Sequence, residues 1–450
     1  MKMTKDLDYQ KRFASFSNYE LYQNLEKGSR NAIKDIGIKY QLTYQELRQL
    51  TDMAVDFVMW DEPSIGKQWN YKEKSIQHSD QMAKKKILGS IYNNWEELKE
   101  NATNYDANGS KREYNTEGKK LKTINGDNAV FGMCPVASEK TVCCNLRTID
   151  VAQGCGLGCS YCSIQTFYEG GTIAVEENLA DKLAAIELDP NKNYHIGSGQ
   201  SSDSLALGNK NGILDTQLEF ARNNPNIILE FKTKSKNVSH LLQAAVPNNI
   251  FVSWSLNPQV FIDHEEARTA TIEQRLQAAR QLADAGILVG FHFHPIVYYH
   301  GWNTDYNDLI NRLMAMFSAR EVGLISFGTL TFIKPAIKSL RMASRRSKIL
   351  QMPFVDAAGK KSYPMETKKK IFSGVWDAFQ PWCDEVFFYF CMEDRQVWES
   401  VFGRCYETND DFEQDLFTSV SKKLQTISEP LTSWINRSEE RRVGKECRSR

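Results

Sequence analysis

The chain has 450 residues, of which 41% are hydrophobic and 25% charged, as is ordinary for a globular protein of two or three domains. Lys and Arg number 56, and so do Asp and Glu, so the formal net charge is zero. This balance argues against strong non-specific attraction to nucleic acid, although a local basic groove remains compatible with it. No apolar run approaches the ~20 residues that span a bilayer, so we expect a cytoplasmic protein without membrane contact. Its ten cysteines are then expected to be reduced thiols or metal ligands.

Residues 1–125 are rich in Lys, Gln, Asn, Tyr and Glu, and they predict a polar, mostly helical extension. Within it, residues 43–60 place apolar side chains in a stripe at helical spacing. Residues 101–122 are polar and interrupted by Gly and Asn, which is typical of a loop or linker.

From residue 126 to about 335 the pattern changes to short apolar or alternating runs separated by helical segments. The clearest helix is residues 271–286, with an acidic start and a glycine at its end. The alternation predicts an α/β fold, with a parallel sheet that is open or curled into a full or partial barrel. Six candidate strands carry this prediction, at residues 146–151, 194–198, 227–233, 250–256, 287–297 and 323–332.

The remainder of the chain divides into two parts. Residues 336–436 are expected to form a C-terminal α/β extension. Residues 437–450, RSEERRVGKECRSR, are highly charged with nothing to bury, so they are expected to be a disordered or vector-like tail without a functional role.

Residues 154–162 read GCGLGCSYC and bring Cys155, Cys159 and Cys162 together just after the first candidate strand. A structural zinc site would use four ligands. Three thiolates on one loop suit a 4Fe-4S cluster that leaves one iron open for a small-molecule ligand. In parallel barrels the loops after the strands build the active site, so we expect the cluster there. A zinc knuckle or a set of buried thiols is the alternative interpretation.

Three neighbouring strands place polar side chains on one face, as the period-two alternation of strands allows. A parallel sheet covered on both faces would instead read as nearly continuous apolar runs. Because unpaired buried polar groups are costly, this face is expected to line a wet or ligand-filled cavity. The polar residues are Glu230, Lys232 and Lys234 on one strand, Ser253, Ser255 and Asn257 on the next, and His292 and His294 on a third.

The second candidate strand ends in GSGQSSD, residues 197–203. Gly197 and Gly199 allow the backbone to approach a ligand closely, and the serines and Asp203 offer hydrogen bonds.

The three-cysteine motif resembles that of the radical S-adenosylmethionine (SAM) superfamily, in which the open iron binds the methionine end of the cofactor. The resemblance narrows to the spore photoproduct lyase family, which it follows over most of residues 130–405. It is carried by the stretches CSYCSIQTFY, YHIGSGQSSDSLALG, LEFKTKS, VSWSLNP, EEARTATIEQRLQAA, GFHFHPI and FYFCMEDRQVWESVFG.

Membership would imply a partial (β/α)6 TIM-type barrel, and a lyase that repairs a thymine photoproduct in DNA by hydrogen-atom abstraction. It would also imply that the three cysteines bind a 4Fe-4S iron–sulfur cluster, that SAM is the cofactor, and that an electron donor such as flavodoxin or ferredoxin is a partner. The expected cofactor-binding residues are Tyr161, Gly197, Ser202, Asp203, Lys234, Ser255 and Asn257.

Two positions depart from the family pattern. The lyases carry a hydrogen-donor cysteine just before a Thr-Ser-Asp stretch, where this chain has Gln200 before Ser201-Ser202-Asp203. They also carry a tyrosine after the third cluster cysteine, where this chain has Ser163. An amide and a primary alcohol hold their hydrogen too strongly to relay it to a carbon radical. The resemblance therefore favours cofactor cleavage over photoproduct repair in its known form.

The catalytic residues are not assigned by the sequence; His292, His294 and Tyr161 are the candidates. Of the other thiols, Cys144 could approach the barrel, but buried structural cysteines are the favoured interpretation. Residues 334–348 and 359–370 are basic enough to contact nucleic acid, or simply to be solvated. The rival functions are a nucleic-acid-binding iron–sulfur or zinc protein without catalysis, and a radical enzyme acting on a protein or metabolite.

Overall fold

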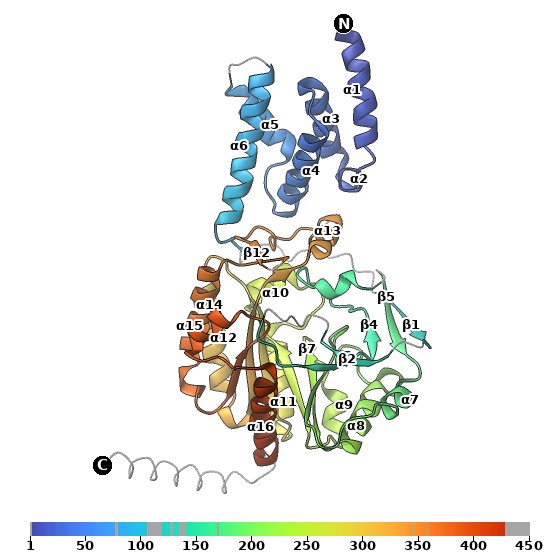
Figure 1. The fold of residues 1–450 in the computed structure, drawn as a ribbon, viewed down its shortest axis with the longest axis vertical. Helices are drawn as coiled ribbons and strands as arrows, with labels where there is room; N and C mark the ends of the chain where they lie inside the picture. Colours follow the sequence, from blue (N-terminus) through green and yellow to red (C-terminus); the bar gives the residue numbers. More distant parts are fainter. Residues whose placement is uncertain are drawn as a thin grey trace, which may run out of the picture.

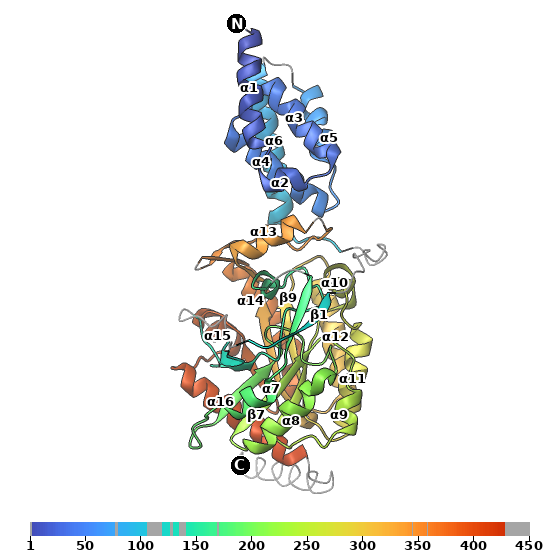
Figure 2. The same ribbon diagram turned by 90° about the vertical axis from the view of Figure 1, so that its right-hand side faces the viewer.

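The structure is a computed structural model, and it describes residues 2–76, 80–105, 119–126, 129–134, 141–168, 171–343, 345–357 and 359–427. It contains a helical body and a larger α/β body, which meet near helix α13 (Lys334–Met342) (Figures 1 and 2). Among the described residues, no helix is both long enough and apolar enough to cross a membrane.

The helical body is built by six helices that pack on one another. Helix α4 is its centre, because its apolar stripe buries Leu50, Met53 and Phe57. The side chain of Thr43 caps it by accepting a hydrogen bond from the Glu46 amide, and the predicted helix at residues 43–60 is confirmed. The helices are α1 (Lys2–Phe16), α2 (Glu20–Asn24), α3 (Lys27–Tyr40), α4 (Tyr44–Met59), α5 (Ile65–Lys74) and α6 (Asp80–Glu100).

An eight-stranded sheet forms the α/β body, in the order β14-β10-β9-β8-β7-β6-β3-β2. All neighbours are parallel except β2 and β3. The edges β14 and β2 do not pair, so the barrel is partial. The strands are β2 (Phe131–Met133), β3 (Arg147–Ile149), β6 (Tyr194–Ser198), β7 (Ile227–Thr233), β8 (Ile250–Ser255), β9 (Val289–Ile296), β10 (Val322–Thr329) and β14 (Phe387–Phe390).

The six predicted strands are all present, and they are neighbours in chain order. The run predicted at residues 323–332 is divided: β10 ends at Thr329 and a short strand, β11 (Thr331–Phe332), turns to pair with β13 (Lys360–Ser362). The strand β14 extends the sheet beyond the predicted six. It was missed because FFYF, residues 387–390, is a short apolar run that periodicity alone cannot distinguish from a buried helix segment.

Helices cover the outer face of the sheet, where aromatic side chains of the strands are buried. Phe293 packs against Tyr306 of α12, and Phe327 packs against Phe379 just after α14. The predicted helix at residues 271–286 is α11, capped by Thr271 and ended by Gly286 at φ 79°. The helices are α7 (Leu179–Ala184), α8 (Ile213–Asn223), α9 (Ser239–Gln243), α10 (Gln259–Glu265), α11 (Ile272–Asp284), α12 (Trp302–Met316), α14 (Met365–Ala378) and α15 (Arg395–Phe402).

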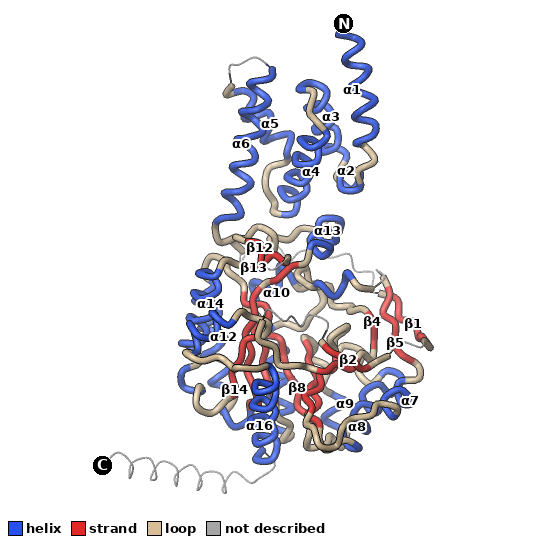
Figure 3. Tube along the Cα trace, viewed as in Figure 1, coloured by secondary structure: helices blue, strands red, loops and turns tan. Residues whose placement is uncertain are grey.

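The opposite, inner face carries the polar residues, and helix α16 (Asn409–Ile427) covers part of it. This helix contacts β6, β10 and β14, and Figure 3 shows it crossing in front of the strands. Two small sheets complete the body: β1 (Lys120–Ile124), β5 (Thr172–Glu176) and β4 (Ala152–Gln153) form one, and β11, β13 and β12 (Val355–Ala357) form the other. Strand β1 begins within the predicted linker 101–122, whose residues 106–118 lie outside the described residues, as does the tail 437–450.

The basic segment 334–348 joins the two bodies. The Arg341 guanidinium donates to both carboxylate oxygens of buried Asp56, at 2.8 and 2.6 Å, and the Ser347 amide donates to the Met59 carbonyl at 2.9 Å. In the other basic segment, Lys361 and Lys368 pair with carboxylates. Much of this charge is therefore bonded within the protein.

Candidate functional site

The loop of residues 154–162 follows β4 and lies against the segment after α10. The Ser160 amide donates to the Glu265 carbonyl at 2.8 Å, and the Arg268 amide donates to the Leu157 carbonyl at 3.0 Å. Gly158 lies between Cys155 and Cys159 and has φ 70°, in the left-handed region that favours glycine. The loop can therefore turn at this residue. The backbone of the three-cysteine loop is therefore fixed by neighbouring chain.

Two further side chains fix this loop, of which Glu265 is buried and Arg345 is partly buried. The Glu265 carboxylate accepts from the Ser160 hydroxyl at 2.5 Å and from the Ser347 hydroxyl at 2.6 Å. The Arg345 guanidinium donates to the carbonyls of Gly158 and Cys159, at 2.9 and 3.5 Å. Because Arg345 and Ser347 lie in the segment that contacts α4, the cysteine loop is linked to the helical body.

The three thiols share one electrostatic environment. Burial raises the pKa of Cys155 to about 12 and also raises that of Cys159, while the Lys234 ammonium opposes both shifts. Cys155 and Cys159 are therefore protonated in the protein alone, and a metal would have to displace those protons on binding. Cys155 and Cys162 are only partly buried, so the loop offers thiols to a ligand.

The donor set fits an iron–sulfur cluster better than a single ion. Among the described residues, no three His, Cys, Asp or Glu side chains converge as ligands of one metal ion. A zinc ion would need such convergence, with sulfurs at ~2.3 Å from one centre. In a cluster, by contrast, each thiolate binds a different iron, so three thiols spread along one loop are a suitable set.

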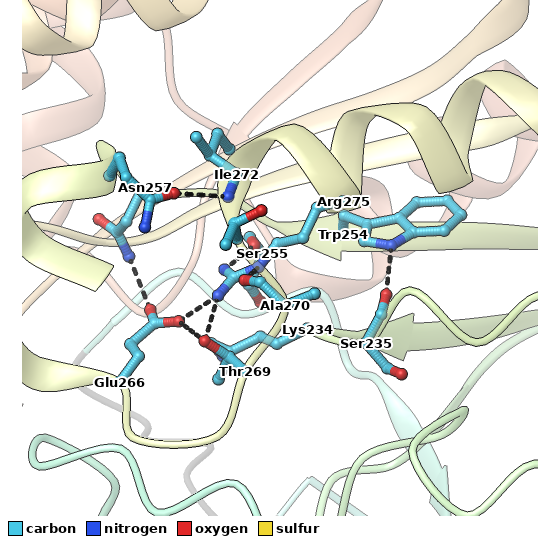
Figure 4. Close-up of polar contacts among 12 residues, drawn as sticks. Lys234, Ser235, Trp254, Ser255, Asn257, Glu266, Thr269, Ala270, Ile272 and Arg275 are labelled. Atoms are coloured by element: carbon cyan, nitrogen blue, oxygen red, sulfur yellow. Dashed lines mark hydrogen bonds and ion pairs between the residues drawn. The ribbon is translucent and has the colours of Figure 1, made fainter. Parts of the chain in front are cut away.

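Tyr161, between the cysteines, is tied to a buried ion pair. Its hydroxyl donates to the Glu266 carboxylate at 2.5 Å, and its ring stacks on Phe261 with centroids 5.6 Å apart. Glu266 also bonds the Arg275 guanidinium and accepts from the Thr269 hydroxyl at 3.0 Å (Figure 4).

The negative charge of the buried Glu266 carboxylate is stabilised by its neighbours. Burial alone would raise its pKa, but the Arg275 guanidinium, the Lys234 ammonium and the hydrogen bonds bring the pKa below the usual value. Arg275 donates in addition to the Ser255 carbonyl at 2.7 Å and the Ala270 carbonyl at 2.9 Å. This network fixes the ends of β7 and β8 relative to the cysteine loop.

The predicted residues after β6 form a compact turn. Asp203 accepts four hydrogen bonds, among them those from the Lys234 amide and the Thr233 hydroxyl, both at 2.7 Å. Its carboxylate therefore fastens this turn to the end of β7, and little of its bonding capacity remains for a ligand. Ser202 and Gln200 are partly exposed. Gly199 is required here, because a Cβ atom would lie 2.4 Å from the Ser204 hydroxyl.

The other predicted cofactor residues lie along the inner face. Lys234 directs its ammonium toward the Tyr161 ring, 5.9 Å from the centroid. Asn257 is fully buried between the Tyr306 hydroxyl, which donates to it at 2.7 Å, and Glu266 at 3.5 Å. Ser255 is buried at the end of β8, and Gly197 lies in β6, where a Cβ atom would come 3.2 Å from Leu146.

His292 and His294 belong to a separate, deeper network on the same face. The Glu230 carboxylate contacts His195 Nε2 at 2.9 Å and His292 Nε2 at 2.5 Å. His292 Nδ1 contacts the Ser326 hydroxyl at 2.5 Å, and that hydroxyl contacts His294 Nε2 at 3.0 Å. Four strands thus contribute to one chain of hydrogen bonds.

In this network we expect the His292 imidazole to resist protonation at low pH. Burial, aided by the Lys232 ammonium, lowers the pKa of His292 to about 4, so the ring stays neutral in the folded protein well below pH 6.5. Between about pH 6.5 and pH 4 this histidine is protonated in the unfolded chain but neutral in the folded protein. The free energy of unfolding should therefore fall as the pH drops through this range, by up to about 1.4 kcal/mol per pH unit. Nitrogen-15 spectra of labelled histidine should show no protonation of His292 above pH 5. Protonation near pH 6.5 would mean that the ring is solvated.

Three of the remaining cysteines, Cys143, Cys144 and Cys391, interact with one another. Cys143 and Cys144 precede β3, and Cys391 follows β14. A hydrogen bond from Cys144 lowers the pKa of Cys143 to about 6, and burial raises that of Cys391 to about 12. The predicted approach of Cys144 to the barrel is consistent with this position.

Sequence reasoning missed the residues that support the loop: Glu265, Glu266, Arg275 and Arg345. The pair Glu265-Glu266 occurs in a stretch already noted for its resemblance, and two adjacent acids before a helix were a usable signal. Arg345 had none, because it is one of many basic residues in its segment.

Comparison with known proteins finds relatives of part of this chain. The sequence model of spore photoproduct lyase matches residues 139–356. A spore photoproduct lyase of Geobacillus is 29% identical over 208 residues, which are 45% of this chain and 61% of that protein. The Bacillus subtilis enzyme is 28% identical over 210 residues, again 45% and 61%. The chain thus spans less than two thirds of the length of these relatives.

Solved structures show the same fold. A mutant spore photoproduct lyase with dinucleoside spore photoproduct matches with a TM-score of 0.53 and 24% identity, over 60% of this chain and 82% of that one. Another, with bound S-adenosylmethionine and the dinucleoside, matches with a TM-score of 0.53 and 22% identity, over 67% and 94%. The expected partial barrel with a helical N-terminal region is confirmed. Residues 139–356 of this chain are therefore similar to the spore photoproduct lyase family of radical SAM proteins.

Proposed function

We propose that the chain is a radical SAM enzyme that cleaves its cofactor reductively and takes a hydrogen atom from a substrate. The observation that carries the proposal is the loop with Cys155, Cys159 and Cys162, held at the end of a partial barrel by the buried Glu265 and the partly buried Arg345. Bound there, a 4Fe-4S cluster would supply the electron that breaks the sulfonium and yields the adenosyl radical. An external electron carrier such as flavodoxin or ferredoxin would be its partner.

The chain's own residues would orient the cofactor. Lys234 lies next to the Tyr161 ring and within electrostatic reach of Cys155 and Cys159, so it would face the anionic end of a ligand on the cluster. Tyr161 is fixed by Glu266 and Phe261, so its ring would form a wall of the adenine site. Asp203 would act by positioning the turn that carries Ser202 rather than by direct contact.

For the substrate we propose nucleic acid, as with the dinucleoside bound by the relatives. Gln200 and Ser163 stand where the family pattern has a hydrogen-donor cysteine and a tyrosine. The reaction would therefore differ from photoproduct repair after the first hydrogen abstraction.

The test is formation of 5′-deoxyadenosine by the anaerobically reconstituted protein with dithionite and SAM. We expect turnover above the no-protein background, and stimulation by ultraviolet-irradiated DNA but not by unirradiated DNA. Turnover without stimulation would contradict the substrate and leave a protein or metabolite as the alternative. Binding of metal and DNA without any 5′-deoxyadenosine would contradict the enzyme and favour a nucleic-acid-binding protein.

A further inference from the structure

Lys232 places a positive charge on the inner face of the barrel. It lies on β7 two residues before Lys234, and residues two apart on a strand share a face, roughly 6–7 Å from one another. Burial lowers the pKa of its ammonium, and its electrostatic neighbours are Glu230, Cys391, Lys234 and Cys134. In the part of the chain that the structure describes, no carboxylate forms an ion pair with Lys232.

Glu230, the carboxylate that acts electrostatically on Lys232, is already bonded. One oxygen contacts His195 Nε2, and the other contacts His292 Nε2 and the Ser253 hydroxyl. These bonds hold the Glu230 carboxylate in place. It therefore offsets the positive charge of Lys232 electrostatically, without a direct contact to the ammonium. Charges withdrawn from water are normally paired directly, and the partly buried Lys232 ammonium, left without such a partner, is suited to receive an anion from a ligand.

His294 is the second feature of this region. His195, Glu230, Ser253, His292 and Ser326 are buried, whereas His294 retains partly exposed surface. Its ring occupies space left by the absent side chain of Gly328, because a Cβ atom there would lie 3.0 Å from His294 Cδ2. Its Nε2 contacts the Ser326 hydroxyl, and the Lys232 ammonium is its largest charged neighbour. A neutral imidazole held in one orientation thus lies beside a cation.

We propose that Lys232 and His294 form a subsite that binds an anionic oxygen group of the substrate, either a phosphodiester or a carboxylate. Lys232 supplies the charge, and His294 adds a hydrogen bond in an orientation set by Ser326 and His292. The subsite depends on the proposed function in one respect: the substrate is taken to lie against the inner face of the sheet, beyond the cofactor residues. It also gives a place for phosphate contact, since the basic segments 334–348 and 359–370 largely bond within the protein.

The experiment follows the histidine ring signals of the nitrogen-15-labelled full chain as dimethyl phosphate or acetate is added at pH 7. We expect the His294 and His292 signals to shift with saturation, while the signal of His240, far along the chain on α9, stays unchanged. Lys232→Met should weaken the affinity at least about tenfold, as expected for a lost charge-assisted hydrogen bond. Lys236→Met, which removes an exposed lysine four residues away, should leave it within about twofold.

The two probes separate the sources of the anion. Tighter binding of dimethyl phosphate assigns the subsite to a nucleic-acid backbone, and tighter binding of acetate assigns it to a carboxylate of a metabolite or peptide. The proposal is overturned if neither probe moves the His294 signal, or if Lys232→Met binds as well as the unmodified chain. Because no cofactor turnover enters this measurement, anion binding without 5′-deoxyadenosine formation would contradict the proposed function and leave the subsite standing.

Discussion

Replacing Cys159 by alanine is expected to abolish both the visible absorbance of the reconstituted cluster and the formation of 5′-deoxyadenosine. Cys159 is the most buried of the three loop cysteines, and the loop around it is fixed by Glu265 and Arg345. In the described part of the chain no other cysteine belongs to this loop, because the others lie between β2 and β3, after α14, after β14 or after α15. A cluster held by two thiolates would be incomplete, so turnover should fall to the no-protein background.

The matched control is Cys383→Ala. Cys383 is partly buried after α14 and its thiol donates to the Phe379 carbonyl, so its loss removes a thiol without touching the loop. Iron content, absorbance and turnover should all be unchanged. If Cys159→Ala retained iron and turnover equal to those of Cys383→Ala, the loop could not be the cluster site. Circular dichroism of both variants would show that the fold is intact.

Sequence reasoning recovered the sheet because its physical signals are local. Each of the six strands is a short apolar or alternating run. Helices α4 and α11 each begin with a threonine cap directly before the helix, so the signal for the helix start is close in sequence. The three-cysteine loop was visible for the same reason, since all its thiols lie within nine residues. The alternation of polar residues on β7, β8 and β9 was enough to place them on one face.

What could not be predicted depends on contacts between distant segments. Nothing near Asp203 in sequence indicates that its carboxylate accepts from the Lys234 amide, and nothing near Arg345 indicates that it bonds the Cys159 carbonyl. The basic segment 334–348 looked like a surface for phosphates, because charge pairing with α4 requires the tertiary fold. His292 and His294 were correctly placed on the polar face, but their chain of bonds to Glu230 follows from the register of four strands.

Replacing Glu266 by alanine is expected to destabilise the full chain by about 3–5 kcal/mol, the usual cost of leaving one member of a buried ion pair without its partner. The side chains of Glu266 and Arg275 are fully buried, and Arg275 cannot release its proton. The Tyr161 hydroxyl would also lose its acceptor. Denaturant unfolding followed by circular dichroism at pH 7 measures the change. The exposed pair Arg222–Glu219 is the control, since Glu219→Ala should cost at most about 1 kcal/mol.

The reverse substitution, Arg275→Met, should show a different pH dependence. In the unmodified chain the pKa of Glu266 is depressed, so its contribution to stability is present above the unfolded value and is lost as the pH falls through the folded value. Without Arg275 the buried carboxylate can take up a proton, so the cost should shrink as the pH is lowered from 8 to 5. The cost of Glu266→Ala should stay constant over the same range, because a guanidinium does not titrate there. Equal pH profiles for the two variants would mean that Glu266 and Arg275 are not a desolvated pair, and that Tyr161 is oriented by other contacts.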